Sequence, residues 1–214
     1  MRYLTGLIFA LVSTPAFAQD EGGKEAPIGG FRIEVHAGIE RPNLNEEDGG
    51  VTYVAKLSSA LAYGAEIGYD FPVSDSFTVG PYAVYDLANS DICETGAQGS
   101  GTYQVCFAAK SNMAAGLRGA FQVGQNGELY LGLGYAKYDY DYSEVFRNSA
   151  NQITSTYAND DGDEGIDVSM GYNHMLNDTI YAGLGMRITE LGDFEGSSVN
   201  LQRFQGQVNL GARF

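Results

Sequence analysis

The sequence has 214 residues, a formal net charge of −15 and only 18% charged residues, yet it contains 29 glycines, 15 tyrosines and 11 phenylalanines. The acidic balance excludes a nucleic-acid-binding protein, because binding of phosphates requires a basic patch. The glycine and aromatic content with so few charges indicates many strands that are apolar on one face, rather than an ordinary soluble enzyme.

The first predicted element is a secretory signal peptide over residues 1–18. Arg2 supplies the positive start, residues 4–12 are apolar, and Ala16 and Ala18 form an A-x-A cleavage site. A transmembrane helix would need about 20 apolar residues, and the polar residues that follow leave too few. We therefore expect cleavage after Ala18 and a mature protein outside the cytoplasm.

Eight segments then alternate apolar with polar or small residues at a period of two, which is typical of strands with one apolar face. Most are roughly 9–11 residues long, the span of a tilted membrane-crossing strand. Pro81, in the third segment, cannot donate to a ladder and predicts a bulge or bend. The segments are 30–40, 61–71, 77–87, 113–123, 129–136, 166–173, 180–189 and 204–214.

Short and long connections alternate between these segments. The short ones, 72–76, 124–127 and 177–178, are rich in turn residues. This alternation predicts an all-β fold: an eight-stranded antiparallel up-and-down transmembrane β-barrel with short periplasmic turns and long extracellular loops. The expected loops are 41–60, 88–110, 140–164 and 190–200.

Barrel closure is predicted from backbone chemistry. Every backbone N–H and C=O in hydrocarbon must be paired, and an open sheet leaves two unpaired edges. The strands near Phe31 and Phe214 should therefore pair. A soluble β-sandwich or lipocalin-like barrel is the alternative, but it would turn a face rich in glycine and alanine toward water. We expect residues 19–29 to form a short periplasmic segment and residues 30–214 to form an outer-membrane barrel.

The two cysteines, Cys93 and Cys106, lie in one glycine- and serine-rich loop. In an exported protein the expected state of such a pair is a disulfide. A metal site or a redox dithiol would require a C-x-x-C motif or a neighbouring histidine, and the loop has neither. The sequence therefore predicts a disulfide that fastens the loop.

The chain resembles the small outer-membrane barrels of the OmpA, OmpX and opacity-protein class, which are often labelled porin-family proteins. The resemblance rests on the signal peptide, the alternating strands, the glycine-rich segments 132–135 and 183–186, and the last strand 204–214. In that class an alternating last strand with a C-terminal Phe is the signal read by the barrel-assembly machinery. The positions that match this signal are Gly206, Val208, Leu210, Ala212 and Phe214, with Ala212 smaller than the usual occupant.

The inward positions of the strands carry charges of both signs. An eight-stranded barrel has an interior just wide enough to be filled by side chains, and buried charges must be paired. One interpretation is a solid polar core, and the other is a narrow gated pore in which a pair such as Glu66–Arg118 exchanges partners. The predicted lumenal cluster is Arg32, Glu34, His36, Glu66, Arg118, Asp167 and Arg187.

Catalysis and metal binding find little support in the sequence. Some barrels of this architecture that the chain resembles trim lipid A with a His and a nearby Ser, but His36 and His174 have no such partner at credible spacing. The acidic run 159–165 fails the EF-hand pattern, although weak divalent binding there is possible. We expect no enzyme activity, no cofactor and no metal. Lys137 faces outward near the outer leaflet, where it can meet lipopolysaccharide phosphates.

The sequence thus predicts a monomeric outer-membrane barrel with a structural or surface-interaction role. Its expected partners are outer-membrane lipid, lipopolysaccharide, the barrel-assembly machinery and an unidentified surface ligand. The tyrosines at 138, 140 and 142 make the third loop the first candidate for recognition, because exposed tyrosine is a common contact residue. A small passive or gated porin-like pore is the alternative function.

Overall fold

A computed structural model of the chain describes residues 29–48, 51–56, 59–193 and 199–214. The expected signal peptide, with its cleavage residues Ala16 and Ala18, lies outside the described residues, as does nearly all of the expected segment 19–29.

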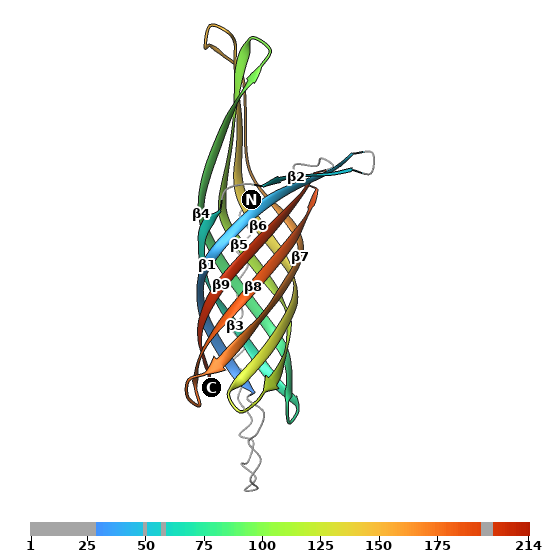
Figure 1. Cartoon of the computed structure of the whole chain (residues 1–214), viewed down its shortest axis with the longest axis vertical. Helices are drawn as coiled ribbons and strands as arrows, with labels where there is room; N and C mark the ends of the chain where they lie inside the picture. The colour runs from blue at the N-terminus through green and yellow to red at the C-terminus, as the bar shows by residue number, and fades with distance from the viewer. Residues whose placement is uncertain (1–28, 49–50, 57–58, 194–198) are drawn as a thin grey trace, which may run out of the picture.

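The described residues form nine strands in one antiparallel sheet, in the order β2-β1-β3-β4-β5-β6-β7-β8-β9 (Figure 1). β1 also pairs with β9, so eight of these nine strands close into a ring, while β2 pairs only with the outer part of β1. The predicted eight-stranded antiparallel barrel is therefore confirmed. The strands are β1 (Gly30–Asp48), β2 (Val51–Lys56), β3 (Ala60–Ser74), β4 (Phe77–Gln98), β5 (Gly101–Val123), β6 (Gly127–Arg147), β7 (Ile153–Met175), β8 (Ile180–Asp193) and β9 (Val199–Arg213).

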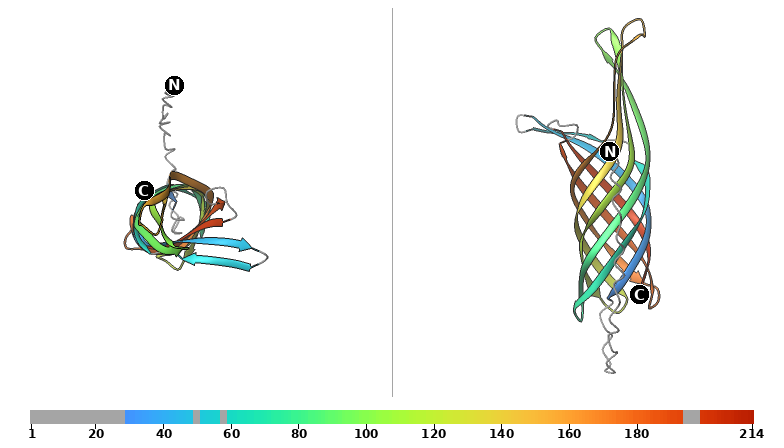
Figure 2. Two further views of the ribbon diagram at one scale, coloured as in Figure 1. Left: turned by 90° about the horizontal axis from the view of Figure 1, so that it is seen from above. Right: turned by 180° about the vertical axis from the view of Figure 1, so that it is seen from behind.

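The ring closes along a seam between its first and last strands. The register of the seam runs from Arg32 opposite Arg213 to Glu46 opposite Val199. Phe31 and Phe214 exchange both backbone hydrogen bonds, at 3.0 and 2.9 Å. Seen from above, the strands form one closed ring (Figure 2). Closure removes both sheet edges that hydrocarbon would otherwise meet.

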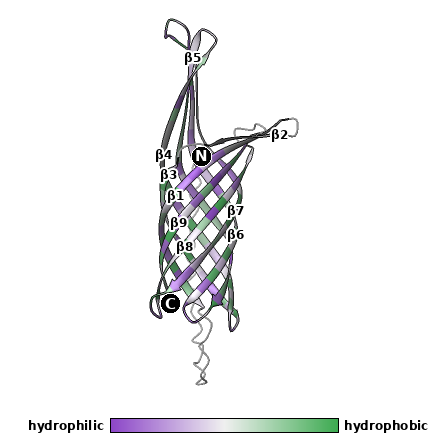
Figure 3. Cartoon of the chain, viewed as in Figure 1, coloured by the Kyte–Doolittle hydropathy of each residue, from purple (hydrophilic) through white to green (hydrophobic). Residues whose placement is uncertain are grey.

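The two faces of the wall differ in polarity, as the alternation predicts. Outward side chains are apolar and exposed, for example Leu184 at 66%, whereas the inward Arg32 is 0% exposed. In Figure 3 hydrophobic and hydrophilic residues accordingly alternate along the barrel strands. Across the described ranges, no helix has the length and hydropathy needed to cross a membrane.

The expected long loops contain regular structure. β4 and β5 extend to a tight turn at Gly99, which has a positive φ of 61°, and β6 and β7 extend to the turn at 148–152. The expected loops 88–110 and 140–164 are therefore mostly strand, and 41–60 holds the end of β1 and all of β2. β-branched and aromatic residues in 102–107, 140–146 and 153–157 favour continued pairing.

Residues 90–109 and 140–161, here called the tongue, form a four-stranded sheet that projects beyond the ring (Figures 1 and 2). We call this end of the barrel the tongue end and the opposite end, with the short turns, the turn end. Phe214 and the start of β1 lie at the turn end.

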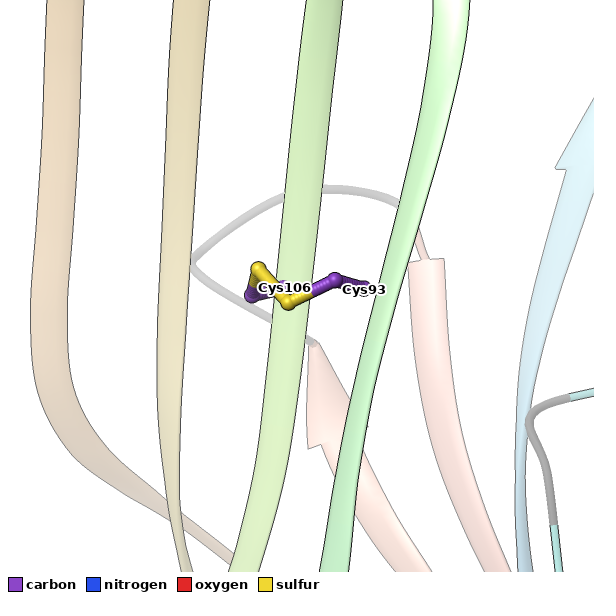
Figure 4. Close-up of a disulfide and its surroundings, with 2 residues drawn as sticks. All are labelled: Cys93 and Cys106. Carbon is purple, nitrogen blue, oxygen red and sulfur yellow. A yellow bond between two sulfur atoms is a disulfide. The ribbon is translucent and has the colours of Figure 1, made fainter.

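The disulfide predicted between Cys93 and Cys106 is present in the structure (Figure 4). The two residues lie directly opposite each other on β4 and β5, with Cα atoms 4.1 Å apart. The bond therefore joins two paired strands of the tongue and does not span an irregular loop. A crosslink that closes a loop of about 15 residues stabilises the linked segment by about 3 kcal/mol in the chain-entropy model.

Two glycines at the seam provide a matched test of its packing. A Cβ added at Gly38 would collide with the backbone of Gly206 and Gln207, whereas a Cβ added at Gly206 would have no heavy atom within 4 Å. We expect Gly38→Ala to lower the free energy of unfolding by about 1–3 kcal/mol through overpacking. Gly206→Ala should be close to neutral. Denaturant unfolding in lipid vesicles measures both, and equal effects would contradict the described seam.

Candidate functional site

The barrel lumen holds the largest set of buried charged side chains among the described residues. All of them are at most 6% exposed, and all come from inward positions of the ring strands. The set contains five arginines, seven carboxylates and one histidine. They are Arg32, Arg118, Arg187, Arg203 and Arg213, Glu34, Glu40, Glu66, Asp70, Asp86, Glu128 and Asp167, and His36.

At the turn end, two arginines share two carboxylates. Arg118 donates to Glu128 at 2.5 Å and to Asp70 at 3.3 Å. Arg213 of β9 reaches the same carboxylates, at 2.8 Å for Glu128 and 2.9 Å for Asp70. This layer joins β3, β5, β6 and β9 across the lumen, so it holds opposite walls together.

Glu66 is the centre of the middle layer. Its Oε1 accepts from Arg32 Nη1 at 2.7 Å, and its Oε2 accepts from Arg187 Nη2 at 2.9 Å. Arg187 also lies 3.5 Å from Asp167, which accepts from the Tyr82 hydroxyl at 3.0 Å. Both oxygens of Glu66 are thus engaged by guanidinium groups from different strands. Charge-assisted hydrogen bonds of this kind are the stronger ones.

Glu34 lies beside this layer. The Tyr181 hydroxyl donates to it at 2.9 Å, and Arg32 lies 3.8 Å away. Arg32 also approaches Asp70 at 3.5 Å, which links the middle layer to the turn-end layer. The lumenal charges therefore form one connected network.

A third layer lies toward the tongue end. His36 Nε2 is 2.5 Å from Asp86 Oδ1, and the other oxygen of Asp86 accepts from Arg203 at 3.1 Å. Arg203 Nε donates to Glu40 at 2.6 Å, and Glu40 also accepts from the Tyr138 hydroxyl at 3.2 Å. These contacts join β1, β4, β6 and β9 across the lumen, just below its mouth.

An apolar cluster fills the mouth above the ionic layers. It comprises Phe107, Ala109, Tyr138, Tyr140, Leu191 and Leu201, and Tyr142 packs against it. Tyr138 and Tyr140 are at most 1% exposed, and the rings of Phe107 and Tyr140 stack at 5.2 Å. The expectation that this tyrosine run is exposed for recognition is wrong for these two residues, because their inward parity continues above the membrane-crossing part of β6.

Inward glycines leave the space that the larger lumenal side chains occupy. A Cβ at Gly171 or Gly185 would collide with the ring or hydroxyl of Tyr130, and one at Gly211 would collide with Tyr181. The glycine-rich inner face and its large tyrosines are thus complementary. Little free volume remains in such an interior.

All seven predicted lumenal residues lie buried in this network, but not all of the expected pairs form. Arg32, Glu34, Glu66, Asp167 and Arg187 are joined in the middle layer, while His36 belongs to the layer above. The expected Glu66–Arg118 pair is replaced: Glu66 binds Arg32 and Arg187, and Arg118 binds Asp70 and Glu128. Because the strands are tilted and staggered, residues at the same distance in sequence from a turn lie at different heights in the barrel.

The predicted cluster omitted Glu40, Asp70, Asp86, Glu128, Arg203 and Arg213. Glu40 and Arg203 lie an even number of residues from the other inward residues of β1 and β9. The alternation of the sequence was therefore sufficient to assign both to the inner face. Asp86 has the same parity as Tyr82 and Val84, which are buried on β4. Glu128 adjoins a turn, and only the ion pairs across the lumen reveal its role.

The metal-ligand residues and the two histidines were the remaining candidates for chemistry. Within the described ranges, no three ligating side chains are grouped closely enough to hold a metal ion. His36 binds a carboxylate, and His174 lies 3.3 Å from the Tyr172 hydroxyl at the turn end. The side chains of residues 159–161 in the acidic run lie outside the described set.

An antiparallel ring of eight strands, apolar outside and ionic inside, defines an outer-membrane β-barrel, and the chain is placed in the bacterial outer membrane. Comparison with protein families finds a match to the autotransporter β-domain over residues 57–187, more than half of the chain. The chain therefore belongs to the autotransporter β-domain family. A search of curated proteins finds no match.

Comparison with solved structures finds several outer-membrane proteins similar to this chain. Ail, the attachment invasion locus protein of Yersinia pestis, is 12% identical over 86% of this chain and 99% of its own, with a TM-score of 0.44. Neisserial surface protein A is 11% identical over 85% and 97%, with a TM-score of 0.46. The Escherichia coli protease OmpT is 8% identical over 86% and 97%, with a TM-score of 0.49. At these identities the likeness concerns the fold alone.

Removal of the central carboxylate tests whether the network stabilises the barrel. Glu66→Ala leaves the facing groups of Arg32 and Arg187 without their shared partner, and loss of one member of a buried ion pair costs about 3–5 kcal/mol. Lys110→Ala is the control, because its pair with Asp141 is 42% and 48% exposed and should be worth about 0–1 kcal/mol. Denaturant unfolding in vesicles measures both. Similar losses for the two variants would contradict a stabilising network.

Proposed function

We propose that this barrel is a closed membrane anchor of the OmpA, OmpX and opacity-protein type, which presents the tongue to partners outside the cell. The observation that carries the proposal is the contrast between the two parts of the molecule. The lumen is filled by ion pairs, tyrosines and an apolar cluster at the mouth. The tongue, in contrast, exposes a pleated surface beyond the membrane.

The tongue offers two free sheet edges. In the described register β4 pairs with β3 only as far as Asn89, and β7 pairs with β8 only from Gly165. The segment 153–158 of β7 carries neither charge nor proline, and Ile153 and Tyr157 are 57% and 46% exposed. Native edges are usually protected by charges, proline or a bulge. The register shifts where Ile153 and Ser155 oppose Arg147 and Phe146, so the regular part of this edge is 155–158. This short uncharged edge favours pairing with an extended segment of another protein.

The charge of the tongue indicates the character of that partner. The tongue contains six carboxylates, at 91, 94, 141, 144, 160 and 161, and one arginine, at 147. A basic partner surface complements this field. The Ail structure contains a heparin analogue, sucrose octasulfate. That ligand is not carried over, because a polyanion would be repelled by these carboxylates.

The proposal also covers export and insertion into the membrane. Cleavage after Ala18 leaves 19–29 in the periplasm, and the machinery that assembles barrels reads the last strand. Its outward residues 206, 208, 210, 212 and 214 face lipid. We propose a monomer, surrounded by outer-membrane lipid and lipopolysaccharide, without enzyme activity or cofactor.

The filled lumen argues against the other roles. A passive pore requires a water-filled path, and transport of a polypeptide requires a wider one, yet five buried arginines and their partners occupy this interior. No transport role is therefore carried over from the name of the family. A gated pore would have to break several buried ion pairs at once, each costly to open.

A shortened tongue tests the presentation role. Replacement of residues 93–106 and 143–158 by Asn-Gly turns keeps the Phe107 and Tyr142 positions paired and removes the projecting sheet. We expect bacteria that express the shortened barrel to adhere to epithelial cell layers no better than bacteria without it, whereas the full-length protein increases adherence. Equal adherence of both forms, at equal surface expression, would contradict the proposal.

Planar-bilayer recording distinguishes the anchor from the pore. We expect no stepwise conductance from the wild-type barrel or from Glu66→Ala, since the layers above and below Glu66 still occlude the lumen. An open porin in the same bilayer serves as the positive control. Reproducible unit steps from the wild type would favour the pore.

A further inference from the structure

The outer wall of the barrel has a hollow over the seam between β8, β9 and β1. Gly206 lies directly opposite Met186 on one side and Ile39 on the other. A hollow of about 420 Å³ lies over Gly206, and its walls include Ile39, Met186 and Phe204.

Barrel packing does not require this glycine. Gly38, Gly171 and Gly211 make room for a neighbouring strand or ring, since a Cβ at any of them would collide. A Cβ at Gly206 would have no heavy atom within 4 Å. A larger apolar residue would fit there and bury its side chain in the hollow. The hollow is therefore open to an occupant from outside the chain.

Arg41 lies at the upper rim of the hollow. It is the next outward residue of β1 after Ile39, it is exposed, and it lines the same cavity. Its Nε donates to Ser59 Oγ at 3.1 Å, which holds the guanidinium in place and leaves its other donors available. Among the described residues no carboxylate lies within 4 Å of it. Glu190, the outward carboxylate of β8 at this level, instead accepts from Gln202 at 3.1 Å.

The depth of Arg41 matches the boundary between hydrocarbon and headgroups. The exposed apolar residues end at Ile39 on β1 and at Leu61 on β3, and the next outward residues are Arg41 and Ser59. On β6 the corresponding step is from Tyr135 to Lys137. Lys137 lies 3.3 Å from Asp139, so its charge is already compensated. Among the side chains that the structure describes, Arg41 thus has no carboxylate partner, and it lies directly above the hollow.

From this arrangement we propose a binding site for one phosphorylated lipid of the outer leaflet. The phosphate accepts hydrogen bonds from the Arg41 guanidinium, and one acyl chain lies in the hollow against Ile39, Gly206 and Met186. Arginine suits this role because its fork of donors matches the oxygens of a phosphate. The site rests on the part of the proposed function that surrounds the barrel with lipopolysaccharide, and it does not involve the tongue.

Native mass spectrometry of the full-length barrel in detergent tests the site. The probes are lipid A with two phosphates and the same lipid A after enzymatic dephosphorylation. We expect Arg41→Gln to weaken binding of the phosphorylated probe about tenfold, the effect of one lost charge-assisted hydrogen bond. Gly206→Leu should weaken binding of both probes, because the side chain occupies the hollow.

Two control variants separate the site from general effects. Lys137→Gln removes another outward cation near this level, and Ala115→Leu places the same outward leucine on β5, the ring strand farthest from β9. Both should bind lipid A like the wild type. Heat-dependent gel migration reports whether each variant is folded.

Three outcomes would overturn the proposal. The first is unchanged binding in folded Arg41→Gln and Gly206→Leu. The second is equal wild-type affinity for both probes, which would mean that the hollow holds acyl chains without recognising phosphate. The third is a wild-type dimer that Gly206→Leu dissociates, which would make the hollow an interface between two copies of the chain.

Discussion

The structure depends on one constraint, namely that hydrocarbon offers no hydrogen-bond partner to an unpaired backbone group. The seam between β1 and β9 satisfies this constraint for the two strands that would otherwise be edges. Closure with eight strands then sets the width of the lumen, which leaves room for side chains and little else. The polarity of both faces follows, because one face meets lipid and the other meets only the opposite wall.

The narrow lumen explains the form of the ionic network. An isolated buried charge is costly, and a buried pair is tolerated only with good geometry and further hydrogen bonds. Glu66 receives two guanidinium groups, and Asp167 receives Arg187, Tyr82 and Thr189. Each such centre also joins strands that are not neighbours in the ring: Glu66–Arg187 joins β3 and β8, and Tyr82–Asp167 joins β4 and β7. The network therefore braces the wall from within and is itself part of the fold.

The sequence predicted the fold in detail because two simple periodicities carry it. Alternation assigned every predicted lumenal residue to the inner face, and connection lengths gave the up-and-down order. Pairing within the lumen was not predictable in the same way. Residue count from the turns places Arg118 and Glu66 at the same height along the barrel axis. The tilt and shear of the strands determine the actual height, and neither can be read from a single sequence. The sequence predicts loops at 88–110 and 140–164 because their glycines and acidic residues are typical of loops. The structure forms strands there because the neighbouring strands stabilise the pairing.

The position of the tyrosines at 138 and 140 shows how far the inner face extends. Their parity on β6 keeps them inward after the strand has left the apolar belt, where a surrounding wall still exists. Above that level β4 and β7 lose their ring partners, and an inside no longer exists. The apolar cluster lies at this transition. Below the cluster, the inward side chains fill the lumen of a closed ring. Above it, the strands no longer enclose a lumen, so its width does not limit their side chains. Side chains in the tongue are therefore not constrained by closure, while the ring below depends on its charge balance and glycine placement to remain closed.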